Sequence, residues 1–183
     1  MFFFSRKSKM SCRELAETLA PRFAKMTVEL FEGEREARGD RSWTVESANG
    51  KCRTDPLKEW ALYSLAGYIQ GCGASTKNDV TYMNFARYFI SESGRDFVKR
   101  GVFSTEVEFD GLTKDCVPQY LEAISDGNAE KAMQSVGRTF LLNVGCNPED
   151  LSQRVGAVGA FMSQSINTKK LFDELQKTVR LVN

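Results

Sequence analysis

The chain of 183 residues carries 25 basic and 24 acidic residues, so its formal net charge is only +1. Such a balance provides no global field to attract nucleic acid or an anionic membrane, and we expect no nucleic-acid partner. The apolar fraction of 42% and the charged fraction of 27% are typical of a globular domain. No stretch approaches the roughly 20 apolar residues of a membrane span and no signal peptide is recognised, so we expect a cytoplasmic protein.

The sequence contains no histidine. This excludes catalysis by Ser-His-Asp or Cys-His groups, haem held by a proximal histidine, and the commonest zinc ligand. The five cysteines show no C-x-x-C spacing, which indicates reduced structural thiols. We therefore expect no cofactor and assign no catalytic or metal-binding residue.

Residues 1–10 combine an aromatic triplet with a basic cluster, and we expect a flexible N-terminal segment. Contact of this segment with an anionic membrane is the minor alternative. A single mainly helical domain is expected over 11–183. Its first helix begins at Ser11, because Ser11 and Glu14 have the spacing of a capping box. The apolar stripe that follows continues past Pro21 and predicts one helix, kinked at the proline.

Two segments predict β structure. Asn49-Gly50 lies between two strand-like stretches and predicts a two-residue antiparallel hairpin over 43–54. From 103 to 110, apolar and polar residues alternate with the period of a half-buried strand, which makes this segment a candidate third strand for the hairpin. If this strand is an edge, a partner strand can add to it. The candidate interaction residues are Phe103, Glu106, Glu108 and Phe109.

Two aromatic-rich helices are predicted over 55–71 and 79–93. Asp55 supplies the N-cap of the first, followed by a proline at the first helical position. Gly71 and Gly94 are expected to end the two helices. The aromatic side chains are the largest apolar group in the chain and are expected to form the centre of the core. The candidate residues for an apolar, aromatic-lined pocket are Trp60, Tyr63, Tyr68, Tyr82 and Phe85.

The last part of the chain is predicted to be helical. A short turn is expected at 95–100, and apolar periodicity predicts further helices from 115, from 128, from 147 and over 168–182. Small residues around Gly156 and Gly137 predict a close helix–helix crossing, with space for a flat ligand or a dimer seam as alternatives. The fold class is therefore mainly α, a single-domain bundle of about seven helices with a small antiparallel β element.

Three classes of function remain. The favoured class is a non-catalytic protein-interaction module (an adaptor, regulator or accessory subunit) with a protein partner or self-association, because no catalytic constellation is visible. The second is a small-molecule-binding helical domain with an apolar pocket. The third is a carboxylate-dependent metal enzyme, since acidic pairs on one helix face can hold magnesium. The acidic pairs are Glu14 with Glu17, Glu29 with Glu32, and Glu122 with Asp126.

Overall fold

The computed structural model describes residues 7–38, 55–76, 79–125 and 128–182. Within these ranges the chain is mainly helical, as predicted, with six α-helices and two short strands. The predicted hairpin over 43–54 lies outside them. In chain order the elements are β1 (Ser8–Ser11), α1 (Cys12–Arg38), α2 (Pro56–Ser75), α3 (Asp79–Lys99), α4 (Glu106–Ala123), α5 (Ala129–Asn143), α6 (Leu151–Thr178) and β2 (Val179–Val182).

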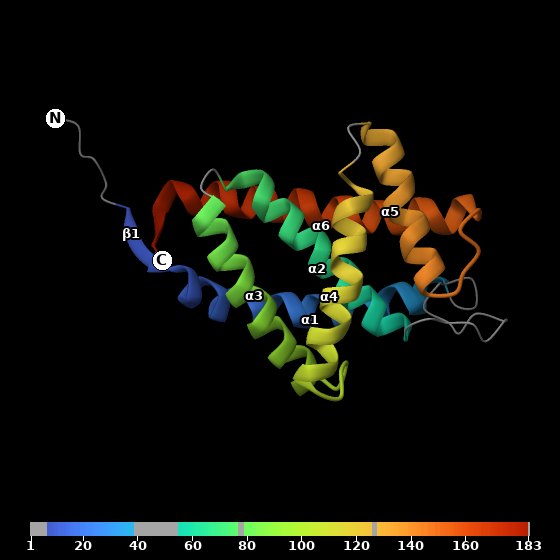
Figure 1. Cartoon of the computed structure of the whole chain (residues 1–183), viewed down its shortest axis with the longest axis horizontal. Helices are drawn as coiled ribbons and strands as arrows, with labels where there is room; N and C mark the ends of the chain where they lie inside the picture. Colours follow the sequence, from blue (N-terminus) through green and yellow to red (C-terminus); the bar gives the residue numbers. More distant parts are fainter. Residues whose placement is uncertain (1–6, 39–54, 77–78, 126–127, 183) are drawn as a thin grey trace.

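The helices α1 and α6 run along the long axis of the molecule, and α2 bridges the space between them (Figure 1). α3 packs along α1, α2 packs along α6, and α4 and α5 contact each other and α2. β1 and β2 form a parallel pair in which Ser8 lies opposite Val179 and Ser11 opposite Val182. Because β1 leads into α1 and β2 follows α6, this sheet joins the start of α1 to the end of α6.

Two helix starts follow the predicted capping chemistry. The backbone and hydroxyl of Ser11 both donate to the Glu14 carboxylate, at 2.8 and 2.9 Å, and the capping box is confirmed. The Asp55 carboxylate accepts from the backbone amides of Leu57 and Lys58, which confirms the cap of α2. α1 also continues through Pro21 as a single helix, as its stripe predicts.

The helix count is lower than expected because two predicted pairs of helices are continuous. α3 runs through Gly94 and includes the turn predicted at 95–100. α6 unites the segments predicted from 147 and from 168. Residues Val179–Val182 were expected to end the last helix but form β2, since two of the four side chains are β-branched and favour a strand. The observed sheet is parallel and joins the start of α1 to the end of α6.

The prediction of a strand over 103–110 is wrong, because this segment contains the start of α4. Thr105 is the N-cap, and its hydroxyl accepts from the Glu108 amide at 3.1 Å. The Glu108 carboxylate accepts from the Ser104 amide at 2.7 Å. The rings of Phe103 and Phe109 meet edge to face at 5.1 Å, and both are buried. A capping-box spacing, T-x-x-E, therefore outweighs the alternation of apolar residues.

This cap predicts a specific acid sensitivity. Hydrogen bonds from Lys58 and from the Ser104 amide hold the pKa of the Glu108 carboxyl below its ordinary value of 4.5. A carboxyl whose pKa is lowered by folding stabilises the folded state above pH 4.5. This contribution is lost as the pH falls through the pKa of the carboxyl in the folded state. We expect Glu108→Gln to lower the free energy of unfolding by about 1 kcal/mol near neutral pH and to match the parent chain in acid.

Urea denaturation of both chains at about pH 7 and at about pH 2.5 measures this difference. Glu14 and Asp173 also have lowered pKa values, but both are present in the two chains and cancel in the comparison. A difference that persists unchanged in acid would contradict the assignment to the Glu108 carboxylate.

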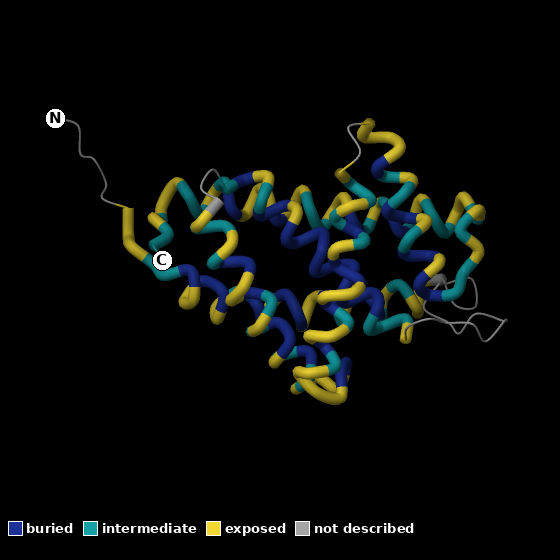
Figure 2. The backbone as a smooth tube through the Cα atoms, in the orientation of Figure 1, coloured by how far each residue is buried: buried dark blue, intermediate teal, exposed yellow. Residues whose placement is uncertain are grey.

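Two glycines that were predicted to end helices lie inside them at crossings. A Cβ on Gly71 would lie 2.2 Å from the backbone oxygen of Ser165, so α2 and α6 approach each other closely there. A Cβ on Gly94 would lie 2.5 Å from the ring of Phe109. The crossing predicted around Gly137 is confirmed, since a Cβ there would lie 2.7 Å from the Val158 side chain of α6. α2 itself is buried along most of its length (Figure 2).

Candidate functional site

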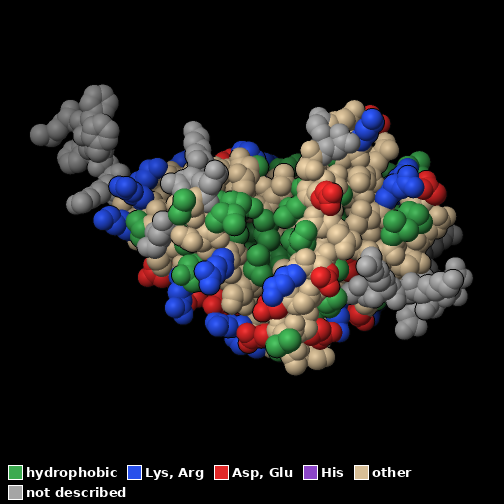
Figure 3. All heavy atoms as spheres, in the orientation of Figure 1, with side chains coloured by type: hydrophobic (Ala, Val, Ile, Leu, Met, Phe, Trp, Pro, Cys, Tyr) green, Lys and Arg blue, Asp and Glu red, His purple; other side chains and the backbone are tan. Residues whose placement is uncertain are grey.

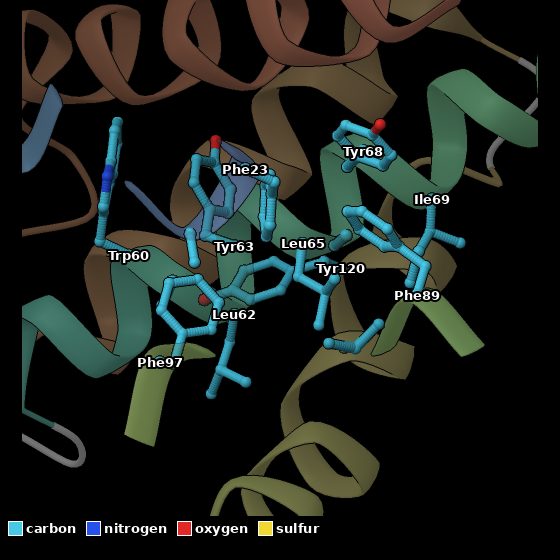
Figure 4. Packing of buried hydrophobic residues seen from close by; sticks show 14 of the residues in the cluster. Phe23, Trp60, Leu62, Tyr63, Leu65, Tyr68, Ile69, Phe89, Phe97 and Tyr120 are labelled. Atoms are coloured by element: carbon cyan, nitrogen blue, oxygen red, sulfur yellow. The ribbon is translucent and has the colours of Figure 1, made fainter. Parts of the chain in front are cut away.

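The five aromatic residues that were candidates for a pocket lie in or at the edge of the core. Figure 4 shows Trp60, Tyr63 and Tyr68 among the packed side chains between the helices. The Trp60 indole donates to the backbone oxygen of Thr27 at 3.0 Å, and the Tyr63 hydroxyl to that of Ala157 at 2.8 Å. Burial raises the pKa of Tyr63 and of Tyr68, so both stay protonated.

Three of these aromatics also form the floor of a groove between α1 and α6. The groove consists of two hollows of about 360 and 200 Å³ that share Met26, Gln164 and Asn167. Trp60 and Tyr63 line the larger hollow. Tyr68 lines the smaller one. The structure thus brings together three of the five predicted pocket residues.

The other two candidates lie elsewhere in the core. The Tyr82 hydroxyl is 3.5 Å from the backbone oxygen of Ile69, to which it donates. The Phe85 ring packs against Phe89 at 5.5 Å and against Phe172 at 4.9 Å. Neither lines the two hollows of the groove.

The walls of the groove carry exposed apolar side chains. Met26 and Leu30 of α1 are 56% and 53% exposed, and Leu171 of α6 is 39% exposed. Both Met26 and Leu30 belong to the apolar stripe that predicts the first helix. α3 packs along α1 and Phe23 is buried, whereas Met26 and Leu30 remain exposed at the groove. From Leu19 to Glu34 the α1 wall is about 22 Å long at 1.5 Å per residue.

Polar groups lie along the α6 side and at the ends of the groove. The amide of Asn167 donates to the Ser163 hydroxyl at 3.3 Å, and Gln164 lies 3.4 Å from Thr168. Arg22 lines the hollow at one end, is exposed, and has no ion-pair partner among residues 7–38, 55–76, 79–125 and 128–182. Glu34 lines the hollow at the other end. The groove therefore combines an aromatic floor and apolar side chains on its walls with polar groups on the α6 side, a cation at one end and an acid at the other.

The four candidate interaction residues of the predicted strand do not form a strand edge. Phe103 and Phe109 are each 1% exposed and pack into the core. Glu106 lies 3.7 Å from Arg95, and Glu108 pairs with Lys58. Because this segment is a turn followed by a helix, it offers no free row of strand amides and carbonyls.

Four acids of the metal hypothesis, Glu14, Glu17, Glu29 and Glu32, have local partners. Glu14 caps α1, Glu17 bonds to Arg13 at 2.8 Å, and Glu32 bonds to Arg35 at 2.8 Å. Asp126 lies outside the described part of the chain. Within that part, no group of three or more His, Cys, Asp or Glu side chains has the geometry to hold a metal ion.

Cys12 and Cys72 are free, buried thiols. Burial is the main cause that raises the pKa of Cys72 to about 12, and it also raises the pKa of Cys12. A thiol with a raised pKa forms little thiolate, which is the reactive species. These two cysteines are therefore structural, as the sequence predicts.

The sequence did not reveal one buried polar cluster. Glu59 of α2 has no exposed surface, and its Oε1 accepts from the Tyr120 hydroxyl and, at 2.9 Å, from the Asn143 amide. Its Oε2 has no hydrogen-bond partner in the described structure. Burial and the nearby carboxyl raise the pKa of Tyr120, so its hydroxyl keeps the proton that it donates. The cluster connects α2, α4 and α5 without reaching the surface.

The face seen in Figure 3 has a second apolar surface. Hydrophobic side chains gather in the middle of this face, where α2 lies between α3 and α4, and charged side chains surround them.

Comparisons with protein-family models, curated proteins and solved structures found no match to this chain. None of the helices in the part that the structure describes combines the length and the apolarity needed to cross a membrane.

Proposed function

We propose that the chain is a non-catalytic protein-interaction module of the cytoplasm, and that its groove between α1 and α6 binds an amphipathic helix of a partner protein. The observation that carries this proposal is the exposure of Met26, Leu30 and Leu171 on the walls of a concave surface with an aromatic floor. Large apolar side chains that remain exposed around a concave surface are typical of a binding site.

A helix fits this groove better than an extended strand. Both walls are helices, and the opening of about 22 Å corresponds to about four helical turns of a third helix. A helix bound in such a groove inserts apolar side chains at positions i, i+3 or i+4, and i+7. An extended peptide would need unpaired backbone groups along the walls, and the α1 and α6 backbones are already bonded within their helices.

The charges at the two ends favour one direction of binding. The carboxyl end of a helix carries partial negative charge and its amino end partial positive charge. The partner helix is therefore expected to direct its carboxyl end towards Arg22 and its amino end towards Glu34. This direction is antiparallel to α1, and an acidic side chain in the last turn of the partner strengthens the contact with Arg22.

An apolar small molecule is the second candidate for the same groove. The larger hollow, of about 360 Å³, lies within the usual size range of ligand pockets. However, the indole N–H of Trp60 and the hydroxyl of Tyr63 are already bonded to backbone oxygens. The floor thus offers few groups that would orient a small polar ligand.

We expect a displayed library of amphipathic 18-residue helices to yield binders of the purified protein. Selected helices are expected to carry an apolar stripe and an acidic last turn. Met26→Glu is expected to weaken their binding at least about tenfold, because it places a charge in the apolar wall. Fluorescence anisotropy of labelled peptides measures the dissociation constant for each variant.

Val107→Glu is the matched control, because Val107 is 81% exposed on α4 and lines neither hollow. It is expected to leave binding unchanged. Selection of no helices, or equal binding to the Met26→Glu variant and the parent chain, would refute the proposal. If an apolar dye binds to saturation in the groove but displaces no bound peptide, the small-molecule alternative would be favoured.

A further inference from the structure

The side of α6 that faces away from the bundle is apolar. α6 packs against α2 and α5 with its inner sides, while four large side chains on one stripe remain exposed. Their exposed fractions are 64% for Leu151, 61% for Val155, 41% for Met162 and 46% for Ile166. A stripe of this kind along four helical turns is a surface that a further helix can cover.

The stripe has the same pattern in both directions along the helix. The intervals between its members are four, seven and four residues. The midpoint lies between Val158 and Gly159, and a Cβ on Gly159 would meet no atom within 4 Å. The surface at Gly159 therefore carries no side chain, and a second helix can approach α6 closely there. A surface that contacts its own copy about a two-fold axis must be self-complementary in this way.

We propose that this outer face of α6, defined by the four exposed side chains, binds the same face of a second copy of the chain. The two α6 helices pack antiparallel, with the two-fold axis near Gly159. In this arrangement Leu151 lies opposite Ile166 of the second copy, and Val155 lies opposite Met162. Each large side chain then packs against another large side chain, and the glycine lies where the two backbones are closest.

The charges at the ends of the stripe favour this antiparallel arrangement. Glu149, just before α6, is exposed, and its carboxylate oxygens are 2.6 Å from Arg138 and 3.8 Å from Arg154. Lys170, beyond Ile166, is exposed and has no ion-pair partner in the described part of the chain. Antiparallel packing places Lys170 of one copy within about one helical turn of Glu149 of the other. Parallel packing would place the two Lys170 side chains together.

Self-association leaves the groove accessible. Gln164 and Leu171 line the groove, whereas Met162 and Ile166 point away from it at 3.6 residues per turn. A dimer formed through the outer face would therefore present two grooves, one on each copy. This inference does not rest on the proposed function, because either surface can operate without the other.

Sedimentation velocity over a wide range of protein concentrations tests the inference. We expect a reversible dimer, and Met162→Glu is expected to weaken it about tenfold or more, because two charges enter the apolar contact. Met83→Glu is the matched control, since Met83 is 63% exposed on α3, outside the outer face of α6. Circular dichroism of both variants checks that the helices are retained. A monomer at every concentration, or an unchanged dimer in the Met162→Glu variant, would overturn the inference.

Disulfide trapping tests the direction of packing, in a chain with Cys52 and Cys146 replaced by serine. We expect a mixture of the Val155→Cys and Met162→Cys chains to form a cross-linked heterodimer, while neither chain cross-links with itself. The two positions lie opposite each other only in the antiparallel pair, and a disulfide requires Cα atoms within about 7 Å. Cross-linking of the Val155→Cys chain with itself, or no cross-link in the mixture, would contradict the antiparallel arrangement.

Discussion

Replacing Gly71 with alanine is expected to lower the free energy of unfolding by about 3 kcal/mol, although alanine favours helix more than glycine does. The added Cβ would lie 2.2 Å from the backbone oxygen of Ser165 and 2.8 Å from the Cβ of Thr168. A backbone atom cannot rotate away as a flexible side chain can, so α2 and α6 must separate. This separation would lose packing along the longest helix contact of α2.

The matched control is Gly111→Ala in α4, where a Cβ would meet no atom within 4 Å. The gain in helix propensity is then the main effect, and we expect stabilisation by about 0.5–1 kcal/mol. Thermal and urea denaturation of both variants measure the two changes. If Gly71→Ala is as stable as the parent chain, the close crossing of α2 and α6 is wrong.

The same crossing determines the depth of the groove. Trp60, Tyr63 and Tyr68 form its floor and belong to α2, whereas one wall belongs to α6. The nearness of α2 to α6 at Gly71 therefore fixes how far the floor lies below the wall. A Gly71→Ala chain that still folds is expected to bind groove peptides more weakly, since the wall would shift relative to the floor.

The positions of the glycines explain why the sequence misplaced two helix ends. Gly71 and Gly94 each follow an apolar helical pattern, and a glycine at that point is a common C-terminal signal. The pattern cannot distinguish a glycine that ends a helix from one that allows a neighbour to approach. The neighbours are Ser165 and Phe109, which lie far away in the sequence or on another helix. Only the tertiary structure identifies these contacts.

The start of α4 shows a second limit of local pattern. The alternating pattern of a strand fits Phe103, Thr105 and Phe109. Both phenylalanines nevertheless reach the same core, one from each side of the helix cap. The spacing of Thr105 and Glu108 was present in the sequence and indicates the cap. The cap outweighed the alternating pattern because it supplies hydrogen-bond acceptors to the backbone amides at the helix start. Among the described residues, no neighbouring strand is available to bond to those amides instead.

The aromatic helices were the most predictable part of the chain. Asp55 caps α2 as expected, and Trp60, Tyr63 and Tyr68 are at most 5% exposed. The exposed wall of the groove was less predictable, because a stripe that includes Met26 and Leu30 indicates an inward face without showing how much of it other helices cover. The sequence therefore predicts which helices are amphipathic, and the packing decides which apolar side chains remain free to bind.

Replacing Glu59 with alanine is expected to lower the free energy of unfolding by about 4 kcal/mol, because the side chain anchors a fully buried polar cluster. Its Oε1 accepts from the hydroxyl of Tyr120 and from the amide of Asn143, which are 0% and 4% exposed. Alanine would leave both donors without this acceptor and would open a cavity between α2, α4 and α5. Urea denaturation measures the loss.

Glu59→Gln separates the two contributions. Its amide oxygen can replace Oε1 as the acceptor, and its NH₂ group would occupy the site of Oε2, which has no hydrogen-bond partner in the described structure. We expect a cost of about 1–2 kcal/mol, well below that of alanine. A double-mutant cycle of Glu59→Ala with Tyr120→Phe then isolates the bond between the carboxyl and the hydroxyl, because alanine removes the acceptor and phenylalanine removes the donor. Strictly additive losses for Glu59→Ala and Tyr120→Phe would contradict that bond. If alanine and glutamine at position 59 lower the free energy of unfolding equally, the cluster is stabilised by the Glu59 carboxyl itself. The number of filled hydrogen-bond sites would then not be the cause.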